Sequence, residues 1–163
     1  MPTPKQMILP PLRAVSFGAA SAIVTSTGVI IGFGAAGLAK SAIIAGLLIV
    51  GLTDNLTDAL SIHIFQESEL QEEGTVFRTT LINFAKRLTI SLSFVALALC
   101  LAGLPLLLAA VAWGGSLLSG LTWLVARKRG AEVSVEILKH LAVAGVVIVV
   151  SRAIGELINA YIR

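Results

Sequence analysis

The longest stretch without a charged residue covers residues 88–126, and its length constrains the fold more than any other feature. As one helix, these 39 residues would be about 59 Å long, nearly twice the roughly 30 Å hydrocarbon core of a bilayer. The stretch is therefore expected to cross a membrane twice. Gly103-Leu104-Pro105 is the predicted break between the two crossings, because glycine and proline interrupt helices.

The composition agrees with a membrane protein. Of the 163 residues, 56% are hydrophobic and 13% are charged, whereas a soluble domain carries about 25% charged residues. The mean hydropathy of +0.95 leaves too few polar groups to cover a water-facing surface. A second uncharged stretch, residues 14–39, greatly exceeds the roughly 7–15 apolar residues of a cleavable signal peptide, so a membrane helix is predicted there.

These patterns predict an all-α, polytopic protein whose single transmembrane domain covers residues 1–163. A very short turn at Lys40 joins the first two helices, and Lys86 and Arg87 are expected to extend toward water at the start of the third. Three consecutive basic residues from Arg127 end the fourth. The five predicted helices cover residues 14–39, 41–65, 83–102, 106–126 and 138–160.

The basic residues also predict an orientation. With the amino terminus in the cytoplasm, nine basic residues lie inside and two outside, as the positive-inside rule requires. Five crossings then place the carboxyl terminus on the opposite side. The inside residues are Lys5, Arg13, Arg78, Lys86, Arg87, Arg127, Lys128, Arg129 and Lys139; the outside residues are Lys40 and Arg163; Arg152 is within the membrane.

Ionisable residues inside a membrane helix mark candidate functional sites, because an unpaired charge there costs several kcal/mol. In the second predicted helix, Asp54, Asp58 and Ser61 recur at helical spacing and share one face. That face can hold a cation or relay protons. The alternative is structural: the aspartates cap a broken helix or bond neighbouring hydroxyl groups, and His63 is an interfacial polar residue.

The first predicted helix carries a second stripe at helical spacing. Ser21 and Thr25 are candidate pathway residues, and Gly28 and Gly32 offer a surface for close helix packing. The two stripes can face each other. The glycines also predict that the first helix takes part in the contact of a homodimer.

Two further groups of charges stand out. Arg152 and Glu156 lie one turn apart in the fifth predicted helix, and a local ion pair is favoured over an interhelical pair of Arg152 with Asp54. After the second helix comes an acidic segment whose carboxylates suit divalent cations. A solvated loop is the alternative for this segment, whose acidic residues are Glu67, Glu69, Glu72 and Glu73.

Several classes of function are set aside. The glycine pattern from Gly32 to Gly37 matches a nucleotide-binding spacing, but no strand precedes it and it lies in a membrane helix. Cys100 is the only cysteine, which excludes an intrachain disulfide and a cysteine-cluster metal site. No nucleic-acid partner, tightly bound cofactor or enzymatic activity is expected, because the basic residues flank apolar segments and no nucleophile or metal-ligand set is apparent.

The order of these features resembles the vacuolar iron transporter family. The segments that carry the resemblance begin at Arg13 (RAVSFGA), Ile23 (IVTSTGV), Ala45 (AGL, continuing to Asp58-Ala59-Leu60-Ser61) and Gly103 (GLPLL). The resemblance implies a five-helix carrier of divalent metal, a homodimer, and a pathway between the two subunits. It covers most of the chain.

This sequence departs from the family pattern where metal would bind. Ser21-Ala22 stands where the family has Asp-Gly, Ile62 replaces a methionine, and a family glutamate corresponds to Gln66 or is shifted to Glu67. Residues 66–82 are too few for the glutamate-rich cytoplasmic domain of some members. We therefore expect a divergent relative that exports Fe²⁺ or Mn²⁺ from the cytoplasm against protons, with Asp54 and Asp58 as the replacement centre and Gln66 in the pathway. The alternative is a scaffold or partner subunit that has lost the metal site.

Overall fold

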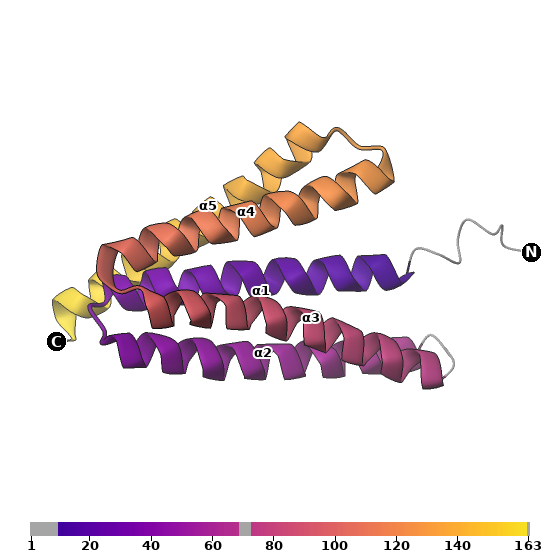
Figure 1. Ribbon diagram of the computed structural model, residues 1–163, viewed down its shortest axis with the longest axis horizontal. Coiled ribbons are helices and arrows are strands. Elements are labelled where there is room, and N and C mark those ends of the chain that lie inside the picture. Colours follow the sequence, from indigo (N-terminus) through magenta and orange to yellow (C-terminus); the bar gives the residue numbers. More distant parts are fainter. Residues whose placement is uncertain (1–9, 69–72, 163) are drawn as a thin grey trace, which may run out of the picture.

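The computed structural model describes residues 10–68 and 73–162, and the side-chain surroundings of residues 18–65, 68 and 77–162 within them. Five helices and no strands are found in these segments, which confirms the predicted all-α class (Figure 1). All five are long and apolar enough to cross a membrane. The helices are α1 (Pro10–Ala35), α2 (Lys40–Ser68), α3 (Glu73–Cys100), α4 (Gly103–Arg129) and α5 (Val133–Tyr161).

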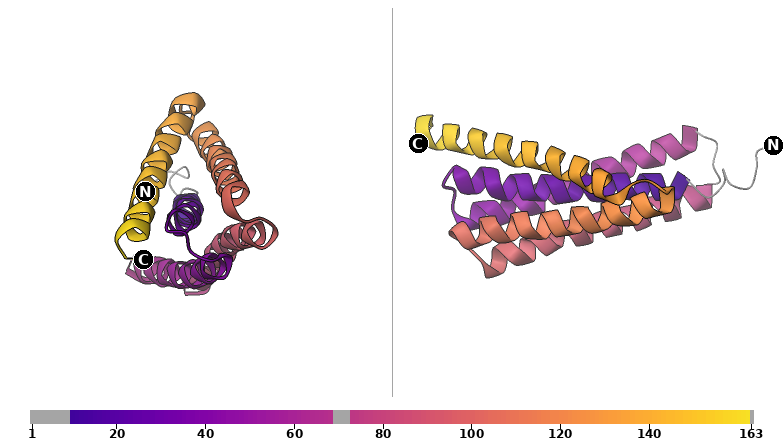
Figure 2. Two further views of the ribbon diagram at one scale, coloured as in Figure 1. Left: turned by 90° about the vertical axis from the view of Figure 1, so that its left-hand side faces the viewer. Right: turned by 90° about the horizontal axis from the view of Figure 1, so that it is seen from above.

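Helix α1 is the central element of the bundle. Seen end-on, it lies inside a triangle formed by the other four helices, and it contacts each of them (Figure 2). Half of its span Gly18–Ala35 is buried, compared with 6% of the α5 span Val133–Tyr161. The small side chains of α1, which include Ala19 and Ala22, allow four helices to pack around it at once.

The two short turns at one end of the bundle explain where α1 and α4 differ from their predicted bounds. Helix α1 ends at Ala35 rather than residue 39, because Gly37 adopts a φ of 69° and Leu38 N–H donates back to the Phe33 carbonyl at 3.1 Å. Gly103, with a φ of 60°, begins α4, and Pro105 fits its first turn, where the missing N–H needs no partner. The uncharged stretch is divided into two helices as predicted, but the break lies at residues 101–102, and the Gly-Leu-Pro segment forms the first turn of α4, which starts at Gly103 rather than residue 106.

Helix α3 shows the largest difference between sequence and structure. It begins at Glu73, ten residues before the predicted start at residue 83. The prediction placed the charged residues Lys86 and Arg87 at the edge of the membrane helix, but a charged side chain does not interrupt backbone hydrogen bonding. The earlier start places Arg87 about 21 Å along the helix axis from its first residue.

The helix ends are divided between the two ends of the bundle. Helix α1 begins at one end of the bundle, where α2 and α4 end and α3 begins, and α5 finishes at the other end (Figure 1). At the second end, Lys40 Nζ donates to the Leu99 carbonyl at 2.6 Å. A cation at the carboxyl end of a helix is favourable, because the last carbonyl groups have no partner within the helix. Lys40 therefore ties the start of α2 to the end of α3.

Candidate functional site

The most strongly polar group in the described bundle is formed between α2 and α3 around Arg87. This side chain is fully buried, and its Nη2 lies 2.7 Å from Asp54 Oδ2. Its Nη1 donates to Asp58, and its Nε donates to Asn55 Oδ1 at 2.9 Å. We call these four residues the Arg87 cluster. The expectation that Arg87 extends toward water at the start of the third helix is wrong, because α3 begins earlier and buries this residue.

Helical spacing explains why the three α2 residues meet one arginine. Asp54 and Asp58 are four residues apart, so their side chains lie one above the other, and Asn55 is adjacent to that line. A guanidinium group carries N–H donors in a planar fork and can serve two carboxylates at once. Asp54 and Asp58 therefore share one face, as predicted, but that face is occupied by an arginine from the neighbouring helix.

The charges of the Arg87 cluster do not cancel when both carboxylates are ionised. One arginine and two aspartates leave a formal charge of one negative unit, in a bundle whose five helices are long and apolar enough to cross a membrane. An uncompensated charge inside a membrane protein is costly. The cluster is therefore suited to accept one more positive charge, either a proton on a carboxyl group or a bound cation.

Gly18 of α1 forms the third wall of the cluster. A Cβ added to this glycine would lie 2.8 Å from Arg87 Cδ, closer than real Cβ contacts permit, and 3.1 Å from Asn83 Oδ1, closer than most of them. The absence of a side chain lets the α1 backbone approach the arginine directly. Gly18 is thus the position at which α1 packs directly against the Arg87 cluster.

Several buried polar atoms in the part of the bundle that holds Arg87 have no hydrogen-bond partner among the described residues. Asn83 of α3 is fully buried, and neither its Oδ1 nor its Nδ2 is bonded. The same holds for Nδ2 of Asn55 and Oγ1 of Thr80. Most buried polar groups in proteins are paired with protein or with ordered water. The unpaired atoms therefore distinguish this site from the rest of the described interior.

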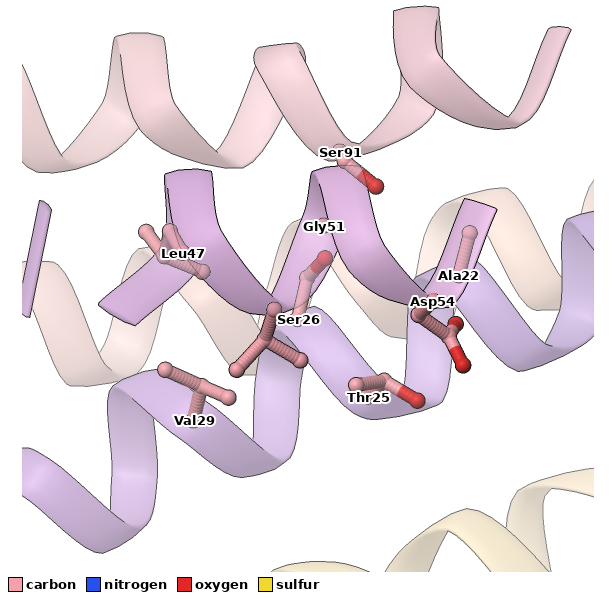
Figure 3. A pocket seen from close by; sticks show the side chains of 9 residues that line it. Ala22, Thr25, Ser26, Val29, Leu47, Gly51, Asp54 and Ser91 are labelled. Carbon is pink, nitrogen blue, oxygen red and sulfur yellow. The ribbon is translucent and has the colours of Figure 1, made fainter. Parts of the chain in front are cut away.

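A small hollow adjoins Asp54 between α1, α2 and α3 (Figure 3). The hydroxyl residues Thr25 and Ser26 of α1 and Ser91 of α3 line it, and Asp54 reaches it with a side chain that is 35% exposed. The remaining lining is apolar or glycine. In this conformation the hollow has no room for a water molecule. Thr25 of the first predicted stripe and Asp54 of the second therefore line the same hollow, whereas Ser21 is not part of the lining.

Other predicted pathway and metal residues lie apart from the cluster or outside the described segments. Ser61 is exposed and donates to the Thr57 carbonyl of its own helix at 2.9 Å. In the side chains that the structure describes, no three His, Cys, Asp or Glu residues gather closely enough to hold a metal ion. The predictions for Gln66, Glu67, Glu69, Glu72 and Glu73 fall on side chains outside that part of the chain.

Gly28 and Gly32 do form a close-packing surface, but within the chain. Cβ atoms added at these positions would lie 3.1 Å from Ser151 Oγ and 3.3 Å from the Ser151 carbonyl oxygen, both on α5. A Cβ on Gly155 of α5 would in turn lie 2.2 Å from the Gly32 carbonyl oxygen. The two helices cross through small residues four positions apart on each side. The expectation that these glycines contact a second subunit is corrected, because α5 of the same chain covers them.

The predicted local pair in α5 is confirmed. Arg152 Nε lies 2.7 Å from Glu156 Oε1, and the alternative partner Asp54 is bound to Arg87 instead. The two side chains are 70% and 56% exposed, on the outer surface of the bundle. This exposed pair is therefore separate from the buried cluster.

The sequence reasoning missed Arg87, Asn55, Asn83, Ser91 and Gly18 as site residues. A signal for three of them was present: Asn83, Arg87 and Ser91 are polar, lie four residues apart, and share one face of an otherwise apolar helix. All three are buried. That signal was obscured because the third helix was predicted to begin at residue 83, which placed two of these residues at the membrane surface.

The fold and the site together define a multi-pass, all-α protein for a lipid bilayer, with one buried arginine–carboxylate cluster in its interior. Comparison of the chain with protein-family models, with curated proteins and with solved structures gives no match.

Proposed function

We propose that this protein is a membrane transporter for a small cation, with Asp54 and Asp58 as its binding centre. The observation that carries the proposal is the surplus negative charge of the Arg87 cluster inside a membrane-spanning bundle. Arg87 acts as a resident counter-ion that stabilises the carboxylates when no cation is bound. A transported cation competes with the arginine for the same oxygen atoms.

The proposed substrate is a divalent metal ion, Fe²⁺ or Mn²⁺, exported from the cytoplasm in exchange for protons. The substrate class comes from the resemblance to the vacuolar iron transporter family, and carboxylate oxygens are suitable ligands for such ions. Both aspartates have oxygens directed at Arg87. A dication therefore has to displace the guanidinium group from at least one carboxylate, since two cations cannot share the site without strong repulsion.

A second candidate function is a non-transporting scaffold or partner subunit. It is favoured by the finding that Arg87 already binds both carboxylates and that no group of three metal-ligating side chains occurs among those described. In that case the cluster only fixes α2 against α3. Purified protein that carries no cation in liposomes would support the scaffold.

We propose that the amino terminus is cytoplasmic. The end of the bundle where α1 begins also holds the basic last turn of α4, formed by Arg127, Lys128 and Arg129. Basic residues favour the cytoplasmic side of a membrane. Reporter fusions to the two termini test this orientation, because five crossings require opposite results.

We also propose a homodimer, with its contact on α5 rather than α1. The exposed face of α5 carries small and β-branched residues at alternating spacings of four and three, the pattern of two helices packed side by side. The Arg152–Glu156 pair lies on or next to this face and is self-complementary: a two-fold axis would bring each arginine near a second carboxylate. A second copy thus covers charges that lipid accommodates poorly. The face comprises Ala142, Val146, Val149, Ala153, Glu156 and Ala160.

The experiment for the proposed function is cation flux into proteoliposomes. Wild-type protein should carry Mn²⁺ or Fe²⁺ into vesicles loaded with a metal-sensitive dye, whereas protein with both Asp54→Asn and Asp58→Asn should not. The matched control is Glu136→Gln, which removes a carboxylate of α5 that lies outside both the cluster and the proposed dimer face. Equal flux through wild-type and the double variant would refute the assignment.

A further inference from the structure

The polar side chains of α3 follow one line along the helix. Thr80, Asn83, Arg87 and Ser91 are spaced three, four and four residues apart, so they lie on one face. Asn83, Arg87 and Ser91 are buried, and Thr80 is partly buried nearer the start of the helix. By the helical rise, Thr80 and Arg87 are about 10 Å apart along the axis. The line therefore leads from the end where α3 begins to the carboxylates of α2.

The same face becomes apolar beyond Ser91. The next two positions on it are Phe94 and Ala98, both fully buried. They belong to an apolar core that includes Ile30 of α1, Leu47 of α2 and Leu106 of α4. The buried face of α3 is thus polar on one side of Ser91 and apolar on the other.

Asn83 indicates what fills the polar half. Its amide offers one acceptor and one donor group, both are enclosed, and neither has a partner in the part of the chain that the structure describes. Thr80 Oγ1, three residues earlier, and Asn55 Nδ2, in the Arg87 cluster, are unpaired as well. An unpaired buried amide is costly, and ordered water is the usual partner of polar groups that lack one in the protein. Because the unpaired atoms follow one another along α3, water bound at one position can hydrogen-bond water at the next.

We propose that water enters the bundle along α3 past Thr80 and Asn83 and reaches Arg87 and Asp58, and that the apolar core around Phe94 closes this path toward the other end. The path is a one-sided access route to the carboxylates. Hydration of Asn83 does not depend on transport activity. The use of this route by a cation or a proton rests on the proposed function. The hollow beside Asp54 does not offer a second route in this conformation, since it has no room for water.

Thiol accessibility tests the path directly. Cys100, the only cysteine, is first removed by Cys100→Ala. Single cysteines are then introduced into this background by Thr80→Cys and Asn83→Cys. Phe94→Cys and Ala98→Cys are the matched controls, because they lie on the same face of the same helix beyond Ser91. A membrane-impermeant thiosulfonate is added to sealed vesicles, separately from each side.

The expected result is that cysteines at 80 and 83 react at least tenfold faster than those at 94 and 98, and only from the side where α3 begins. The proposal is overturned if position 83 reacts no faster than position 94, or if it reacts equally from both sides. Thr80→Cys changes the side chain little and keeps the test valid if Asn83→Cys does not fold. If positions 80 and 83 are labelled but the protein carries no cation, the hydrated path is supported and only the transport function is refuted.

Discussion

Arg87 and Asp54 are 33 residues apart in the sequence, yet Nη2 of the arginine lies 2.7 Å from Oδ2 of the aspartate in the interior of the bundle. The same guanidinium group also binds Asp58 and Asn55, so α2 and α3 are joined by one side chain from α3 and three from α2. A contact of this kind can stabilise the fold, hold a transport site, or do both.

Removing Arg87 should destabilise the protein because it leaves two partly buried carboxylates without a cation. We expect Arg87→Gln to lower the free energy of unfolding by about 3–5 kcal/mol, the usual cost of breaking a buried ion pair by deleting one partner. Lys86→Gln is the control, since Lys86 is the exposed neighbour. Thermal unfolding in detergent measures both variants.

Adding Asp54→Asn and Asp58→Asn to Arg87→Gln should restore much of the lost stability, because the cluster then contains no net charge. A triple variant that is no more stable than Arg87→Gln alone would show that lost packing of the arginine, rather than unpaired charge, causes the destabilisation.

Asp58→Asn should abolish cation flux with little loss of folded protein. The amide keeps the shape of the side chain, and Arg87 retains Asp54 as its ion-pair partner, which leaves the cluster without a formal net charge. Neutralising Glu69, Glu72 and Glu73 together should only reduce apparent affinity, because these residues are predicted to attract cations rather than to bind them in the pathway. Flux in proteoliposomes compares the two variants. Wild-type flux through Asp58→Asn, with none through the glutamate variant, would move the site to the acidic segment.

Gly18→Ala should destabilise the bundle, because the new methyl group would overlap Arg87 and Asn83. Overpacking of this kind costs about 1–3 kcal/mol. Gly115→Ala is the matched control: a Cβ there meets nothing within 4 Å, so the higher helix propensity of alanine should leave stability equal or slightly higher. The changes in the free energy of unfolding of the two variants, measured by chemical or thermal unfolding, should therefore differ in sign. Equal changes would mean that α1 does not approach the cluster this closely.

Cross-linking tests the proposed contact on α5. In the Cys100→Ala background, Val149→Cys should form a disulfide-linked dimer in membranes, since Val149 is 67% exposed on the proposed face. Val147→Cys is the control, because Val147 faces Gly28 of α1 in the same chain and its Cγ1 would lie 3.4 Å from a Cβ added there. Oxidised samples are compared by non-reducing electrophoresis. Dimer formed equally at both positions, or at neither, would contradict this interface.

The sequence by itself determined the features that depend on the bilayer and on helical spacing. Long uncharged stretches have to form helices in lipid, because every backbone polar group needs a partner within the helix, and five crossings follow from their number and length. Spacing of four residues placed Asp54 beside Asp58 and paired Arg152 with Glu156. Such relationships need no knowledge of the neighbouring helices.

The tertiary structure alone decided which helix faces meet. Spacing shows that Gly28 and Gly32 form a smooth surface, but not that Ser151 and Gly155 of α5 cover it rather than a second subunit. It likewise shows a polar line on α3 without showing that Arg87 reaches Asp54 and Asp58. The physical reason is that lipid and apolar side chains are nearly equivalent surroundings for a membrane helix, so the partner of each face is selected by close packing and polar contacts that only the assembled bundle contains.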